Sequence, residues 1–115
     1  MYDFLLSEES KKIRDEAIDF VKWVPRQMII DMDKDERKFP KEFLQEAGRR
    51  NLLGCRYPEK WGGRGLDWVT TATIMEEIGT LGYIFACTFG VGAELVCDAI
   101  ILHGTDDQKE KYQGL

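Results

Sequence analysis

The sequence predicts an all-α protein, and three observations support this fold class. Apolar residues recur at intervals of three and four positions, which places them along one face of a helix. Residues that favour helix starts, Ser7, Asp67 and Thr105, stand just before such segments. No segment shows the alternation of apolar and polar residues that is typical of a half-buried strand. We therefore expect helices joined by turns, without a sheet.

The chain of 115 residues is expected to form one domain. It carries 16 basic and 21 acidic residues, a net charge of -5. Binding to nucleic acid or to an anionic membrane depends on clustered lysine and arginine, so this charge argues against both partners. The densest basic group, Arg49 and Arg50 with Arg56, is too small to change that expectation.

Cys55, Cys87 and Cys97 are an odd number of cysteines without the Cys-x-x-Cys spacing of a zinc site. We expect free thiols in a reducing compartment rather than a disulfide framework. The N-terminus lacks the basic and apolar regions of a signal peptide, and no run approaches the roughly 20 apolar residues of a membrane span. These observations predict a cytoplasmic protein without a membrane span.

The first helix is expected to start after Ser7, because a capping hydroxyl followed by two glutamates suits the positive end of the helix dipole. Its apolar stripe consists of Ile13, Ala17, Phe20, Val21 and Val24. Pro25 lacks an amide hydrogen, so it should either kink this helix or stand in the first turn of a second one. The second pattern dissolves in the charged run 31–38, which predicts a solvated helix end and loop.

The next helix is expected to begin with Pro40, because the first helical position tolerates proline. It should end at Asn51, since asparagine adopts the left-handed conformation more readily than most residues. The stretch 57–67 contains three glycines in four positions. Glycine reaches backbone conformations that strain other residues, so this stretch predicts a tight, shaped connection between two helical layers.

Asp67 is a predicted N-cap for a helix whose pattern continues until Gly79 and Gly82. The segment 83–103 is apolar nearly all round, so we expect it to be the central, buried helix, with Gly104 as its C-cap. Thr105 begins a capping-box pattern, which predicts a last short helix.

The residues alone show no catalytic apparatus. His103 lacks a glutamate three positions before it, so we expect it to cap or pack at a helix end rather than bind metal. Glu76 and Glu77 point about 100° apart on a helix and cannot share a site. Glu94 is expected to be a surface or ion-paired residue; buried and unpaired, it would have a raised pKa and could act as an acid.

Gly90 and Gly92 stand within the apolar helix, where a glycine costs about 1 kcal/mol relative to alanine. The compensating role is either close helix packing or open space beside a ligand. A dinucleotide fingerprint is rejected because a helix precedes these glycines and Leu95 occupies the third glycine position.

Five stretches occur in a definite order along nearly the whole chain. They are DMDKDERKFP (31–40), LLG (52–54), YPEKWGGRGLD (57–67), EEIG (76–79) and HGTDDQKEKY (103–112). Together they resemble the N-terminal helical domain of the acyl-CoA dehydrogenase family. The resemblance implies that residues 1–115 form an orthogonal up-down bundle of about five or six helices.

In that family the domain precedes a middle β-domain and a C-terminal helical domain, and the enzyme binds FAD. A glutamate removes the α-proton of an acyl-CoA thioester while hydride passes from the β-carbon to the flavin. Electrons usually leave through an electron-transfer flavoprotein, and the full-length protein would be a homodimer or homotetramer. The catalytic glutamate and most FAD and CoA contacts are expected beyond Leu115, so the 115-residue chain is expected to be inactive alone.

The resemblance also implies that this domain supplies one wall of the acyl pocket, at Cys87, Thr88, Val91 and Leu95. These residues can share one helix face, and a thioester tail needs an apolar slot. The alternative is that all four are ordinary core. Two other functions stay open: a stand-alone helical interaction module without catalysis, or a family offshoot such as an acyl-CoA oxidase or a flavin-dependent monooxygenase.

Overall fold

The fold is described from a computed structural model, which describes residues 3–112. Its helical elements are α1 (Glu8–Trp23), α2 (Arg26–Asp33), α3 (Lys41–Arg49), α4 (Trp68–Gly79), α5 (Tyr83–Gly90), a π-helical segment (Val91–Val96), α6 (Cys97–His103) and α7 (Asp106–Lys111), with 3-10 turns at Asp3–Leu5 and Glu59–Trp61. The elements α5, the π-helical segment and α6 form one continuous helix, Tyr83–His103. Counted in this way, the described part of the chain has six α-helices and no strand, which confirms the all-α fold class.

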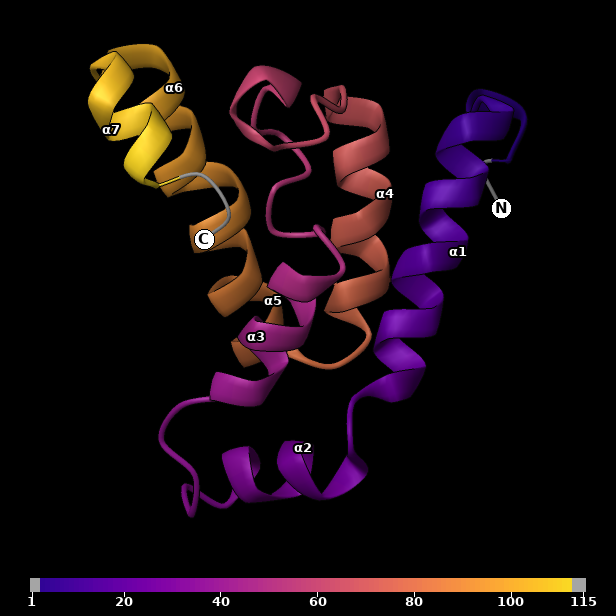
Figure 1. Ribbon diagram of the computed structural model, residues 1–115. Helices are drawn as coiled ribbons and strands as arrows, with labels where there is room; N and C mark the ends of the chain where they lie inside the picture. Colours follow the sequence, from indigo (N-terminus) through magenta and orange to yellow (C-terminus); the bar gives the residue numbers. More distant parts are fainter. Residues whose placement is uncertain (1–2, 113–115) are drawn as a thin grey trace.

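The helices form a thin, up-down arrangement (Figure 1). Helices α1 and α4 lie side by side, the continuous helix runs in the opposite direction beyond α4, and α2 crosses one end of the group. The molecule measures 41 × 36 × 19 Å. Because a helix with its side chains is about 10 Å across, the shortest dimension holds two helices. Several helices therefore have a neighbour on one side only.

The predicted helix starts are confirmed. Ser7 Oγ accepts a hydrogen bond from the Ser10 amide (3.1 Å) at the start of α1. Asp67 does the same for the Thr70 amide (2.8 Å) at the start of α4. The capping box that begins at Thr105 is complete at the start of α7. These caps satisfy amides that have no partner within the helix.

The predicted helix breaks also fall close to their expected places. Pro25 follows the end of α1 and is the N-cap of α2. Pro40 is the N-cap of α3 rather than its first residue. Asn51 has a φ of 55°, which confirms the left-handed conformation after α3. The charged run 31–38 contains the end of α2 and a mostly exposed loop, as expected.

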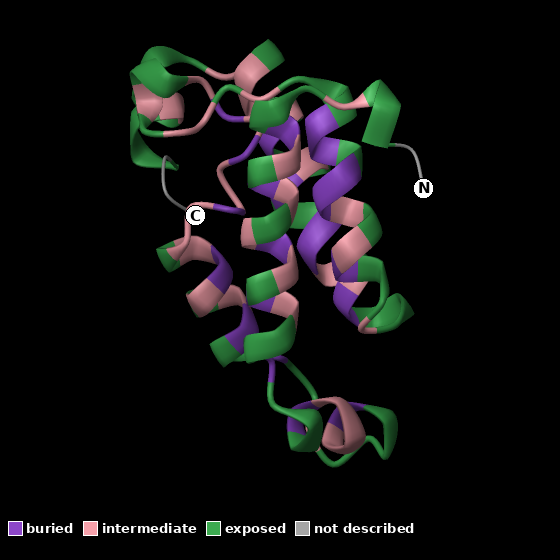
Figure 2. Ribbon diagram, turned by 90° about the vertical axis from the view of Figure 1, so that its right-hand side faces the viewer, coloured by how far each residue is buried: buried purple, intermediate pink, exposed green. Residues whose placement is uncertain are grey.

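The core is centred on phenylalanines from three helices. The ring centroid of Phe43 in α3 lies 5.2 Å from that of Phe20 in α1 and 5.1 Å from that of Phe85 in α5. All three side chains are buried, and Figure 2 shows the buried positions along the inner sides of the long helices. Aromatic contacts of this kind add to the hydrophobic stabilisation, so these rings hold α1, α3 and α5 together.

The glycine-rich stretch 57–67 forms the shaped corner that the sequence predicts. Gly62 and Gly65 have φ values of 89° and 59°, which favour glycine. The Gly65 amide donates a hydrogen bond to Tyr57 O (2.9 Å), which folds the stretch back on itself. The corner is therefore an ordered turn.

Two side chains tie this corner to the ends of the domain. The Arg64 guanidinium pairs with Glu16 of α1 at 2.7 Å. The Tyr57 hydroxyl donates a hydrogen bond to Lys109 O of α7, also at 2.7 Å. Through these contacts the corner connects the first long helix to the last short one.

The expected burial of the helix Tyr83–His103 is wrong. Only 22% of the most apolar 18-residue stretch of this helix is buried. Tyr83, Leu95 and Leu102 are 83%, 68% and 72% exposed. The helix packs on one face, and nothing in residues 3–112 covers the other. An apolar surface all round a helix indicates that it needs cover, but does not identify which residues supply that cover.

The same helix corrects the expectation about membrane-spanning length. Its 21 residues are long and apolar enough to cross a membrane by length and composition alone. The sequence has no unbroken apolar run of that length, because Glu94 and Asp98 lie within this helix. Core helices of soluble proteins pass the same test, so length and composition are weak evidence for a membrane span.

Gly104 follows α6 for a different reason from the one expected. Its backbone is extended, with a φ of -76°, rather than left-handed. A Cβ at this position would lie 2.5 Å from Ile100 O. Close approach to the last helical turn is therefore what requires glycine here.

Candidate functional site

An open, mostly apolar groove runs between α3 and the continuous helix. Its volume is about 1040 Å³, close to the upper end of the range for small-molecule clefts. One wall comes from α3 and the residues beside it, and the other from α5 and the π-helical segment. The lining residues are Phe39, Leu44, Gln45, Gly48, Arg49, Leu53, Cys87, Thr88, Val91, Gly92 and Val96.

Three of the four predicted acyl-pocket residues share this groove. Cys87, Thr88 and Val91 line it, whereas Leu95 lines a separate hollow of about 460 Å³ further along the helix. Val96 borders both, so the two hollows adjoin. The alternative of an ordinary core position fails for Cys87, Val91 and Leu95, because all three are exposed. Their contact with a substrate stays a prediction.

The α3 side supplies a wall that sequence reasoning missed. Phe39, Leu44 and Leu53 present apolar side chains to the groove. A signal existed in Leu44: it directly follows the core residue Phe43, so it points about 100° away from the core. The residues that face Leu44 across the groove lie far along the chain. The apolar stripe of one helix does not show which other helix it faces.

The groove offers few free polar groups. Thr88 Oγ1 donates a hydrogen bond to Ile84 O at 2.7 Å, within its own helix. At the rim, Arg49 pairs with Glu46, and Arg50 contacts the same carboxylate at 2.8 Å. Hydrogen bonds from these two guanidinium groups lower the pKa of Glu46 to about 2. Because the charged groups at the rim are paired and the walls are apolar, the groove suits an uncharged, apolar ligand.

The lining of the groove does not fit the pyrophosphate of FAD. Phosphates are held by converging backbone amides or by free cationic side chains, and the rim cation Arg49 is already paired. Among residues 3–112, no three His, Cys, Asp or Glu side chains form a group that could hold a metal ion. This domain can therefore line a pocket, but the groove shows no cradle for the cofactor.

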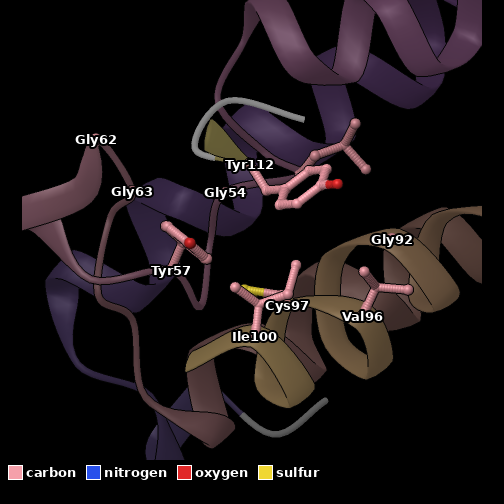
Figure 3. A pocket seen from close by; sticks show the side chains of 10 residues that line it. Gly54, Tyr57, Gly62, Gly63, Gly92, Val96, Cys97, Ile100 and Tyr112 are labelled. Carbon is pink, nitrogen blue, oxygen red and sulfur yellow. The ribbon is translucent and has the colours of Figure 1, made fainter. Parts of the chain in front are cut away.

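A small cavity adjoins the groove beneath the glycine corner (Figure 3). Tyr57 and Tyr112 lie on one side of it, and Val96, Cys97 and Ile100 of the continuous helix lie on the other. Its volume of about 20 Å³ has room for about one water molecule. It is a packing gap between corner and helix rather than a ligand site.

Arg56 fastens the corner to the continuous helix. Its guanidinium lies 3.8 Å from the Trp68 ring centroid, donates to Leu66 O at 3.0 Å and approaches Asp98 at 3.7 Å. The Nε atom of Arg56 is buried without a hydrogen-bond partner, and the Trp68 ring and the Asp98 carboxylate are the main groups that offset the cost of burying it.

Burial raises the pKa of Glu94, with Asp98 adding to the effect and Arg56 opposing it. Glu94 does not line the groove, so it is no candidate acid there.

The two glycines of the continuous helix have different explanations. A Cβ on Gly90 would lie 3.1 Å from Met75 Cε, which indicates close packing on α4. A Cβ on Gly92 would meet only Leu53 Cδ2, at 3.8 Å, and Gly92 lines the groove. Close packing therefore explains Gly90, and open space explains Gly92.

We predict that Cys87 alone reacts rapidly with a thiol reagent in the native 115-residue chain. Cys87 is exposed, whereas Cys55 and Cys97 are buried. Burial raises the pKa of Cys55 and raises that of Cys97 to about 12, so both stay protonated at neutral pH, and the thiolate is the reactive form. Titration with Ellman's reagent should show one fast thiol, which Cys87→Ser removes. Rapid labelling of the Cys87→Ser variant would contradict the assigned burial.

The chain matches the family model for "Acyl-CoA dehydrogenase, N-terminal domain" over residues 7–114. It is 31% identical to the mitochondrial isovaleryl-CoA dehydrogenase of Bos taurus, over 93% of this chain and 25% of the relative. It is 29% identical to the short-chain specific acyl-CoA dehydrogenase of Clostridium acetobutylicum, over 96% of this chain and 29% of the relative. It is also 29% identical to the caffeyl-CoA reductase-Etf complex subunit CarC of Acetobacterium woodii, over 92% and 28%. No solved structure matches significantly.

The chain thus spans between 25% and 29% of the length of these relatives. The family match covers nearly the whole chain. It includes all five motifs, which lie between residues 31 and 112. The all-helical fold agrees with that match. The chain belongs to the acyl-CoA dehydrogenase family, in which it corresponds to the N-terminal helical domain.

Proposed function

We propose that this chain forms one wall of the acyl pocket in an FAD-dependent enzyme that oxidises the α,β bond of an acyl-CoA thioester. The observation that carries the proposal is the apolar groove, with Cys87, Thr88 and Val91 on one wall. Each methylene of an acyl chain that leaves water for such a surface contributes about 0.8 kcal/mol. The groove can therefore hold and orient an acyl tail without charged contacts.

The remainder of the site would come from residues outside this chain. The relatives are more than three times as long as the part that matches, and the exposed face of the continuous helix needs cover. We propose that a middle β-domain and a C-terminal helical domain supply that cover, the FAD site and the catalytic glutamate. No described carboxylate is proposed as the base, because Glu76, Glu77 and Glu94 all lie outside the groove.

An electron-transfer flavoprotein is the proposed redox partner, since one relative is named as a subunit of an Etf complex. That relative is also named a reductase, so reduction of an α,β-unsaturated acyl-CoA is the second candidate reaction. A cytoplasmic homodimer or homotetramer completes the proposal. The free thiols of Cys55, Cys87 and Cys97 are consistent with a reducing compartment.

The test is to express the protein from its complete gene and compare Val91→Trp with Val69→Trp. Val91 lines the groove, whereas Val69 is exposed on α4 away from it. The unaltered protein should show flavin absorbance that bleaches anaerobically with an acyl-CoA. Val91→Trp should lower kcat/KM by about ten-fold or more at unchanged flavin content, because an indole fills the slot. Val69→Trp should behave like the unaltered protein.

Two outcomes would count against this function. Colourless full-length protein that shows no acyl-CoA-dependent reaction would favour the helical interaction module instead. Equal kcat/KM for Val91→Trp and Val69→Trp would show that the groove does not contact the substrate.

A further inference from the structure

The buried side chains of the continuous helix follow an unusual spacing. Phe85, Phe89, Ala93 and Cys97 are each at most 6% exposed, and every neighbouring pair is four positions apart. In a regular α-helix a turn takes 3.6 residues, so each interval of four overshoots a full turn by about 40°. Three such intervals accumulate about 120°, which would turn Cys97 away from the face that Phe85 buries.

The π-helical segment Val91–Val96 removes this accumulated rotation. A π-helical turn closes its hydrogen bond one residue later than an α-helical turn, so a π segment takes up one extra residue. One residue corresponds to about 100° of rotation in an α-helix. The segment therefore returns Cys97 to the buried face, and the helix keeps one straight line of core contacts.

The π-helical segment borders the groove, which Val91, Gly92 and Val96 help to line. Gly92 lies inside the π-helical segment and lines both the groove and the small adjoining cavity (Figure 3). It has no side chain, and the space where a Cβ would stand is open apart from Leu53 Cδ2 at 3.8 Å. Gly92 thus leaves a gap in the groove wall between Val91 and Val96.

We propose that the π-helical segment is a one-residue insertion that opens the groove at Gly92 and determines which acyl groups the groove admits. The inference rests on the proposed function, because it names the part of the same pocket that sets substrate size. The core needs only the register of Phe85, Phe89, Ala93 and Cys97, which a shorter helix can also provide. The insertion therefore serves the groove rather than the fold.

The test is deletion of Gly92 in the protein expressed from its complete gene. The four core residues would then be spaced by four, three and four, and a regular α-helix would bring Cys97 to within about 20° of Phe85. The variant should fold, with a melting temperature within about 5 °C of the unaltered protein. Its Cys97 should stay protected from thiol reagents.

Deletion of Asp15 is the matched control. Asp15 is exposed in α1, between the buried Ile13 and Ala17, and that helix has no π-helical turn to absorb a lost residue. Its removal rotates the second half of the α1 stripe by about 100° and should abolish folding. If deletion of Gly92 destabilises the protein as severely as deletion of Asp15, the insertion is structural and the proposal fails.

Substrate range is the second readout. Deletion of Gly92 should lower kcat/KM for the bulkiest accepted acyl-CoA by about ten-fold or more relative to the smallest. Gly92→Ala keeps the residue count and fills the gap with one methyl, so it should shift the ratio in the same direction. An unchanged ratio in both variants overturns the proposal. Absence of acyl-CoA turnover in the unaltered protein instead overturns the proposed function, and the comparison of melting temperatures still decides the register.

Discussion

Replacing Phe43 with alanine should lower the free energy of unfolding by about 3–5 kcal/mol, the usual cost of this truncation in a core. Phe43 is fully buried, and its ring lies 5.2 Å from Phe20 and 5.1 Å from Phe85. The truncation leaves a cavity where three helices meet, in a molecule only 19 Å thick. Total stability of a small domain is about 5–15 kcal/mol, so the loss is a large fraction of it. Urea unfolding of the 115-residue chain, followed by circular dichroism, measures the change.

Phe39→Ala is the matched control, because Phe39 precedes the same helix and is 56% exposed. Its truncation should change the free energy of unfolding by no more than about 0.5 kcal/mol. Equal costs for Phe39→Ala and Phe43→Ala would contradict the assignment of Phe43 to the centre of the core. Phe39→Ala should still widen the groove, so its effect belongs to binding rather than to stability.

The sequence predicted those parts of the fold that depend on local interactions. The caps at Ser7, Asp67 and Thr105 and the left-handed Asn51 are confirmed, because each is decided by atoms a few residues away. The corner at 57–67 is confirmed for the same reason.

The expectations that failed concern contacts between distant segments. Burial of the helix Tyr83–His103 depends on which segments pack against it, and helical periodicity does not predict those contacts. The groove was half predicted: Cys87, Thr88 and Val91 came from the resemblance, while the α3 wall requires knowing which helices face each other. The π-helical segment left a signal in the four-residue spacing of buried positions. This spacing can be recognised only when it is known which residues are buried, because the same helix is also apolar on its exposed face.

Replacing Gly63 with alanine should lower the free energy of unfolding by about 3 kcal/mol or more, in the range of overpacking and strain. A Cβ at Gly63 would lie 2.5 Å from Tyr57 Cβ and closer still to the Tyr57 carbonyl group. No rotamer change can relieve a clash with these atoms, so the corner has to open. Opening breaks the bond from the Gly65 amide to Tyr57 O and pulls the Tyr57 hydroxyl from Lys109 O. The cost therefore includes contacts that hold α7 in place.

Gly79→Ala is the matched control for this prediction. Gly79 is the last residue of α4, and a Cβ there would meet nothing within 4 Å. Alanine favours a helix over glycine by about 1 kcal/mol, so this change should be neutral or stabilising in the same urea titration. A loss below about 1 kcal/mol for Gly63→Ala would contradict the close approach at the corner, since strain at an incompatible site exceeds that value. Because both variants add a single methyl group, the difference between them isolates the fit of the corner against Tyr57.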